Sequence, residues 1–187
     1  MIYLRSIFLS VLLVASVLAL PVAAQTNILA VDPLIVAVYE NQVENVRALV
    51  VRKHPMSRAG GDGRTAMMWG SIQGSYDSLV LILEAGAQIN VVDEAGNNSL
   101  YHAAENGHIE VVELLLSHNA EIDRENRDGR TPLMAAARAG HQGVLATLIA
   151  AGAEVGLSDF TGRTALDLAR EGRSRKVVQM LEKAERR

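Results

Sequence analysis

The chain repeats one arrangement of turn, capping and apolar residues every 33 positions. A glycine opens each copy, a residue suited to cap a helix follows two positions later, and an apolar residue follows after two more. The glycines are Gly63, Gly96, Gly129 and Gly162, the capping residues are Thr65, Asn98, Thr131 and Thr164, and the apolar residues are Met67, Leu100, Leu133 and Leu166. Asp32-Pro33-Leu34 begins a further copy at the front. Self-similarity at this period predicts an array of small stacked units.

The fourth copy shows which elements a single repeat encodes. Thr131 is placed to cap a short helix, and Pro132 occupies the first helical position, where its missing N–H is not needed. Gly140 ends that helix because glycine tolerates the left-handed conformation of a helix C-cap. The segment 141–150 then predicts a second helix, which ends before Gly152. Each copy is therefore predicted to fold as a turn, a short helix, a second turn and a longer helix.

A unit of this size cannot bury its apolar face alone, so the copies must stack on one another. The sequence predicts an all-α solenoid of five helix-turn-helix repeats, linked by β-turn or hairpin loops. The approximate repeat boundaries are 27–59, 60–92, 93–125, 126–158 and 159–187. Small residues within the first helices, such as Ala136-Ala137, would let neighbouring first helices approach closely.

Two segments of this array resemble ankyrin repeats. They are residues 107–116, with the sequence GHIEVVELLL, and residues 128–133, with the sequence DGRTPL, followed by Gly140-His141. The resemblance extends over nearly the whole chain after residue 24. Departures fall in the two end copies, where Ala30, Asn41, Lys53 and Arg173 stand in place of the usual glycines. Terminal repeats of a solenoid are expected to differ in this way because each has an outward-facing side.

The resemblance implies that a protein partner binds the concave face of the stack, which hairpin loops and first helices form in this family. The contact residues expected on that face are Tyr39, Arg64, Ile72, Gln73, Asn97, Tyr101, Glu105, Asn106, Arg127, Arg130, Arg138, Phe160 and Arg163. We expect Tyr101 to be exposed there, since tyrosine is enriched at interface hot spots. Trp69 is either a further contact anchor or part of the core, and the packed leucine usual at its position favours the core.

The amino-acid composition argues against several kinds of functional site. The 187 residues include 18 Lys plus Arg, 21 Asp plus Glu and no cysteine. No disulfide or thiolate metal site can form, and no basic excess favours nucleic acid. The five histidines form no pair three or four positions apart, so we expect no metal ion and no cofactor. Ser117-His118 and Ser174 lack partners at a spacing typical of nucleophilic catalysis, and we expect no enzymatic activity.

Histidines also begin two of the predicted second helices. His108 and His141 each follow the glycine that ends the preceding first helix. The family resemblance implies that histidine at this position serves packing and hydrogen bonding.

The first 24 residues form a segment of a different kind. Arg5 precedes an apolar run over residues 7–20, and the small residues Val22 and Ala24 follow. This order predicts a secretory signal peptide that is cleaved after Ala24. The alternative is an uncleaved membrane anchor, although the run is shorter than the ~20 residues that span a bilayer. The remaining residues 25–187 carry 17 basic and 21 acidic side chains, a net charge of −4.

Two function classes fit these observations. The first is a non-enzymatic interaction protein, resembling short ankyrin-repeat proteins of the bacterial periplasm, that scaffolds or protects an envelope partner such as the oxidative-stress enzyme catalase. The second is an immunity or inhibitor protein that neutralises a toxin directed at the envelope. In both classes we expect a monomer that binds a protein and no nucleic acid. Membrane association would require the N-terminal segment to stay uncleaved.

Overall fold

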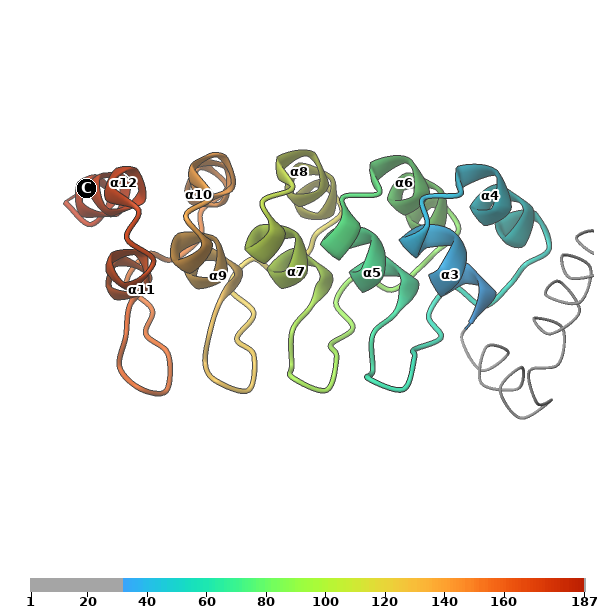
Figure 1. The fold of residues 1–187 in the computed structure, drawn as a ribbon, viewed down its shortest axis with the longest axis horizontal. Coiled ribbons are helices and arrows are strands. Elements are labelled where there is room, and N and C mark those ends of the chain that lie inside the picture. The colour runs from blue at the N-terminus through green and yellow to red at the C-terminus, as the bar shows by residue number, and fades with distance from the viewer. Residues whose placement is uncertain (1–31, 187) are drawn as a thin grey trace, which may run out of the picture. The chain divides into compact units, whose positions relative to one another are not determined.

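The computed structural model describes residues 32–186, and within them the chain forms five pairs of helices (Figure 1). The first helices of the pairs are α3 (Pro33–Tyr39), α5 (Ala66–Gln73), α7 (Ser99–Asn106), α9 (Pro132–Ala139) and α11 (Ala165–Glu171). The second helices are α4 (Val43–Val51), α6 (Tyr76–Glu84), α8 (Ile109–Ser117), α10 (Gln142–Ala150) and α12 (Arg175–Ala184). The predicted all-α solenoid of helix-turn-helix repeats is confirmed. The predicted signal segment 1–24 and Ala30 lie outside the described residues.

The helices lie in two layers (Figure 1). The first helices stand side by side in chain order, and each contacts the next; the second helices do the same beside them. Hairpin loops project beyond the first helices on the side away from the second helices (Figure 1). Two of these loops are closed by isolated antiparallel bridges, which join Ala59 to Thr65 and Ser158 to Thr164. No helix within residues 32–186 is long and apolar enough to cross a lipid bilayer.

Helix ends follow the capping pattern of the sequence. Thr131 Oγ1 accepts a hydrogen bond from the Met134 N–H at 3.3 Å, and Gly140 ends α9 with a φ of 84°. Where the end repeats lack glycine, Asn41, Lys53 and Arg173 adopt the same left-handed conformation, with φ between 53° and 57°. The predicted helix ends are therefore confirmed, and the substituted residues keep the turn geometry of the glycines.

The core runs through the stack as a row of equivalent side chains. Its largest recurring members are Leu34, Met67, Leu100, Leu133 and Leu166, none of which is more than 7% exposed. Small residues beside them allow close approach of the helices. A Cβ added at Gly70 would lie 2.9 Å from a Val38 methyl carbon and 2.7 Å from a Leu79 methyl carbon. The predicted role of small residues in first-helix packing is confirmed at this position.

Histidines join successive repeats at the start of the second helices. His108 Nε2 lies 2.9 Å from the carbonyl oxygen of Ile72, and His141 Nε2 lies 3.0 Å from that of Glu105. Each histidine therefore binds the end of the first helix of the preceding repeat. The packing and hydrogen bonding predicted for these two histidines are confirmed.

Candidate protein-binding surface

Each of the last three hairpins is built around one polar side chain at its first position. Asp93 Oδ1 accepts the N–H groups of Ala95 and Asn97, each at 2.9 Å. Asn126 and Asp159 bind the corresponding two N–H groups of their own hairpins, at 2.9 Å and 3.0 Å respectively. The same acceptor geometry recurs because an aspartate or asparagine oxygen can satisfy two amides of a tight loop.

Successive hairpins are also joined to each other. The Arg127 N–H donates to the Ala95 carbonyl oxygen at 3.0 Å, and the Phe160 N–H donates to that of Asp128 at 2.9 Å. Side chains at a shared position of the repeat add further links, and we call this set the hairpin row. It consists of Arg64, Asn97, Arg130 and Arg163. Its first three members contact the polar side chain that opens the next hairpin, at 3.5 Å, 2.8 Å and 3.5 Å respectively.

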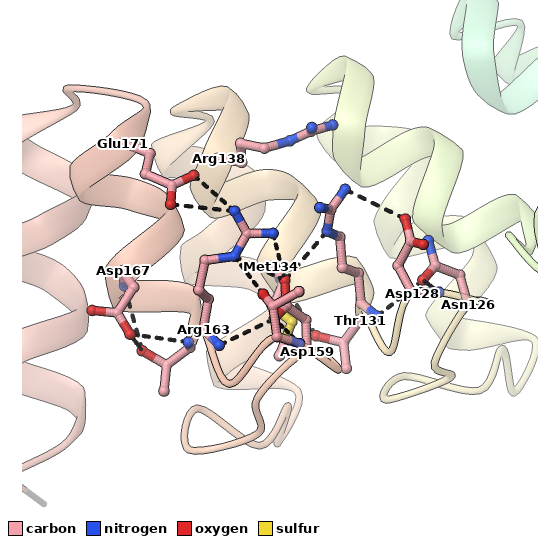
Figure 2. A network of polar contacts seen from close by, with 12 residues as sticks. Asn126, Asp128, Thr131, Met134, Arg138, Asp159, Arg163, Asp167 and Glu171 are labelled. Carbon is pink, nitrogen blue, oxygen red and sulfur yellow. Dashed lines mark hydrogen bonds and ion pairs between the residues drawn. The ribbon is translucent and has the colours of Figure 1, made fainter.

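The last hairpin centres on the buried carboxylate of Asp159 (Figure 2). Arg163 donates to it from Nη2 at 2.9 Å, and Thr161 Oγ1 donates at 2.6 Å. Burial alone would raise the pKa of Asp159, but the hydrogen bonds from Thr161 and Arg163 outweigh it and hold this pKa well below its usual range. Arg163 lies between Asp159 and Glu171 of α11, which it contacts at 3.3 Å (Figure 2). The charge of Arg163 is therefore fixed in place by partners from its own repeat.

Asp93 forms a second buried polar group. Its Oδ2 lies 2.9 Å from His102 Nε2 and 3.5 Å from Arg64 Nε of the preceding repeat. Burial lowers the pKa of His102 and outweighs the opposing effect of the Asp93 carboxylate. The imidazole is therefore neutral at neutral pH and donates its Nε2–H to Asp93. Burial would raise the pKa of Asp93, but the Asn97 N–H and His102 lower it further than burial raises it.

One side chain from each first helix occupies the same position of the repeat, and we call this set the first-helix row. It consists of Tyr39, Ile72, Glu105, Arg138 and Glu171. All five are at least partly exposed, and their helices stand side by side. Arg138 Nη2 and Glu105 Oε1 form an ion pair at 2.8 Å across adjacent repeats. The row therefore offers one accessible side chain in each repeat along the stack.

A family model described as ankyrin repeats in three copies matches residues 79–159 and residues 100–185, which together make up more than half of the chain. The chain belongs to the ankyrin-repeat family. No curated protein matches it. Ankyrin repeats are protein–protein interaction modules, and the surface described above is therefore a candidate for contacts with a protein.

The ankyrin stack leaves every predicted contact residue at least partly exposed except one. Eight of them belong to the two rows already described. Tyr39, Ile72, Glu105 and Arg138 lie in the first-helix row, and Arg64 and Arg130 lie in the hairpin row. Asn97 and Arg163 complete the hairpin row. Gln73 and Asn106 are exposed one position beyond the first-helix row, at the ends of α5 and α7.

The prediction that Tyr101 is exposed is wrong, because this residue is only 4% exposed. It occupies the position that Met68 and Met134 fill in the neighbouring ankyrin repeats, and both methionines are buried as well. Burial raises the pKa of Tyr101, and Glu105 adds to that effect while Arg138 opposes it. The Tyr101 side chain is therefore part of the buried interior of the stack.

Trp69 lies at the boundary between core and surface. It packs against the buried core but remains partly exposed, so the predicted core packing is confirmed without complete burial. The Tyr39 ring meets it edge to face, with centroids 5.4 Å apart. The Arg64 guanidinium lies 5.2 Å from the Trp69 ring centroid, within the range of a cation–π contact.

Two predicted contact residues stand on the hairpins at equivalent positions. Phe160 is 72% exposed, and its ring lies against Gly129 of the preceding hairpin, where an added Cβ would come within 2.6 Å of it. Arg127, one repeat earlier, is also exposed. One further exposed apolar residue, Val36 on α3, was not predicted, although it is 38% exposed. It lies 33 positions before Trp69, at a register where the later repeats carry buried residues, so the repeat pattern alone would not have identified its exposure.

Three kinds of polar side-chain grouping bear on the question of catalysis. Among the described residues, no three His, Cys, Asp or Glu side chains come together as metal ligands. Ser117 Oγ lies 3.1 Å from His118 Nδ1, but both atoms also bind the Leu114 carbonyl oxygen, which makes them a cap on the end of α8. The side chains of Asp93 and His102 are each only 3% exposed, so a substrate cannot reach that pair.

Proposed function

We propose that the ankyrin stack binds a protein partner through its first helices and hairpins. The observation that carries this proposal is the first-helix row, in which all five repeats offer an accessible side chain at the same position. The helices that bear the row are packed against a continuous core, so the contact surface is held rigid before binding. A rigid extended surface of this kind suits recognition of another protein by many small contacts.

We further propose that the protein is exported to the bacterial periplasm, where it scaffolds or protects an envelope partner such as an oxidative-stress enzyme of the catalase type. The apolar run over residues 7–20 and the small residues that follow it support export. The class of partner rests on the resemblance to short exported ankyrin-repeat proteins. A non-enzymatic role is supported by the family and by the capping contacts of Ser117 and His118.

Affinity capture from the organism's own cell envelope tests binding through this surface. The wild-type protein is compared with a double variant, Gln73→Arg with Arg138→Glu, which changes the charge on α5 and α9. Both side chains are exposed, so the melting temperature should hardly change while recovery of the partner falls. The control is Glu110→Lys with Glu113→Lys, which alters exposed side chains of α8 in the other helix layer. Loss of capture in the control pair alone would place the interface on the second helices and contradict the proposal.

The identity of the recovered protein also tests the proposed role. Recovery of a catalase-like enzyme supports a scaffold or protective function. Recovery of a secreted toxin, whose activity falls when the ankyrin protein is added, would instead establish an inhibitor. A toxin gene beside this gene would point to the same conclusion.

A further inference from the structure

The first-helix surface is not uniform along the stack. At its N-terminal end lies a group of four apolar or aromatic side chains, which we call the apolar patch. It consists of Val36, Tyr39, Trp69 and Ile72. Val36 and Trp69 share one position of the repeat, Tyr39 and Ile72 share another, and the helices that carry them, α3 and α5, are in contact. Val36 is 38% and Tyr39 50% exposed, and the other two are partly exposed.

Later repeats use the same two positions differently. At the position of Val36 and Trp69 they carry buried residues, His102 among them. At the position of Tyr39 and Ile72 they carry Glu105, Arg138 and Glu171, which are charged and held in ion pairs at 2.8 Å and 3.3 Å. A partner that bound there would have to compete with those pairs. The apolar patch instead offers accessible apolar surface whose burial is favourable in itself.

Charged side chains adjoin the apolar patch. Arg64 lies over Trp69, but its guanidinium is already within 3.5 Å of Asp93 and 3.7 Å of Asp62. Glu40 follows Tyr39 directly and is exposed. Glu94 is also exposed, on the hairpin that lies against Gly63. Asp62 and Asp93 offset the charge of Arg64, and the exposed carboxylates of Glu40 and Glu94 therefore favour a cationic ligand.

We infer that the apolar patch is the primary docking site for a basic amphipathic segment of the protein partner. This inference rests on the proposed function and names the chemistry of the ligand. An apolar side chain of the segment packs against the rings of Tyr39 and Trp69, which contact each other edge to face. A neighbouring Lys or Arg lies close to Glu40 and Glu94 and makes a cation–π contact with the exposed tyrosine ring. Aromatic rings with carboxylates around them reject an acidic segment, because like charges would be brought together.

Peptide selection against the immobilised full-length protein tests this inference. A library of random linear peptides displayed on phage is enriched on the wild-type protein, and the affinity of selected peptides is then measured by fluorescence anisotropy. We expect the selected peptides to combine aromatic or aliphatic residues with Lys or Arg. Their affinity should fall about tenfold or more for Tyr39→Ser, as for a typical hot-spot residue. It should also fall for Glu40→Lys with Glu94→Lys, a variant that changes only exposed side chains.

The control variant, Glu110→Lys with Glu113→Lys on α8, lies outside the candidate surface and should leave the affinity unchanged. A comparison variant, Arg138→Glu with Phe160→Ser, alters exposed residues of that surface outside the apolar patch and should lower the affinity less than Tyr39→Ser does. Selection of acidic peptides, or of none, would overturn the inference. Peptides whose affinity falls only in the comparison variant would also overturn it, but that result would leave the proposed function intact. Peptides whose binding is lost only in the variant Glu110→Lys with Glu113→Lys would overturn both this inference and the proposed function. A dimer that Tyr39→Ser dissociates would also overturn the inference, because it would identify a second copy of the chain as the ligand.

Discussion

His102 donates its Nε2–H to the Asp93 carboxylate across 2.9 Å, and each side chain is only 3% exposed. Because burial lowers the pKa of His102 below its ordinary value of 6.5, the native protein keeps this imidazole neutral under conditions in which the unfolded chain protonates it. The unfolded state therefore binds more protons than the native state as the pH falls through 6.5, and the free energy of unfolding falls with it.

We expect urea titrations to show lower stability at about pH 5 than at about pH 7. The decrease should be smaller in His102→Gln, which retains an N–H donor for Asp93 but has no group that titrates in this range. The other four histidines are present in both proteins, so the comparison isolates His102. An identical pH dependence in the two proteins would show that the pKa of His102 is not lowered.

Leu133→Ala tests the stacked core. Leu133 is fully buried in a central repeat, and its truncation should cost on the order of 2–5 kcal/mol through lost burial and an unfilled cavity. A domain holds only about 5–15 kcal/mol in total, so the urea midpoint should fall visibly. Leu133→Met keeps most of the volume and should cost less than about 1.5 kcal/mol. Equal midpoints for wild type and Leu133→Ala would contradict the arrangement of the core.

Tyr101 should behave as a core residue rather than a contact residue. Tyr101→Ala removes a buried ring and should cost about 3–5 kcal/mol, as other large aromatic truncations do. Tyr101→Phe keeps the ring and loses only the hydroxyl, so it should cost about 1 kcal/mol. Thermal unfolding followed by circular dichroism measures both variants. A stable Tyr101→Ala protein that fails to bind its partner would restore the role that the sequence first suggested.

Much of this architecture is predictable because every repeat carries capping and core residues at the same positions. The caps at Thr131 and Gly140 and the row of buried residues that includes Leu133 follow directly from the period of the sequence. The burial of Tyr101 does not follow from the residue type, because tyrosine is common at interfaces. Only the comparison with Met68 and Met134, which are buried at the same position of the repeat, shows that this position is interior. The pairing of Arg64 with Asp93 also depends on how adjacent hairpins lie, which no single repeat encodes.

The Asp159 carboxylate provides a test of the hairpin links. Asp159→Ala removes the acceptor of the Thr161 and Arg163 N–H groups and should cost about 1–3 kcal/mol. Asp159→Asn should cost less, because Asn126 already shows that an asparagine oxygen binds the two equivalent N–H groups. Urea unfolding of the two variants measures the difference. If both cost the same, the charge of Asp159, rather than its role as an acceptor, stabilises the hairpin.

Export is tested by the mass and location of the protein in its own organism. Cleavage after Ala24 would leave a chain that begins at Gln25, because the small residues Val22 and Ala24 stand at the positions that a signal peptidase reads. We expect osmotic shock to release this shorter chain, and intact-mass measurement to show the loss of residues 1–24. Replacing Ala24 with a bulky residue, Ala24→Phe, should block processing and keep the protein with the membrane. A full-length mass in the membrane fraction of wild-type cells would instead establish an uncleaved anchor, and a full-length mass in the cytoplasm would exclude export altogether.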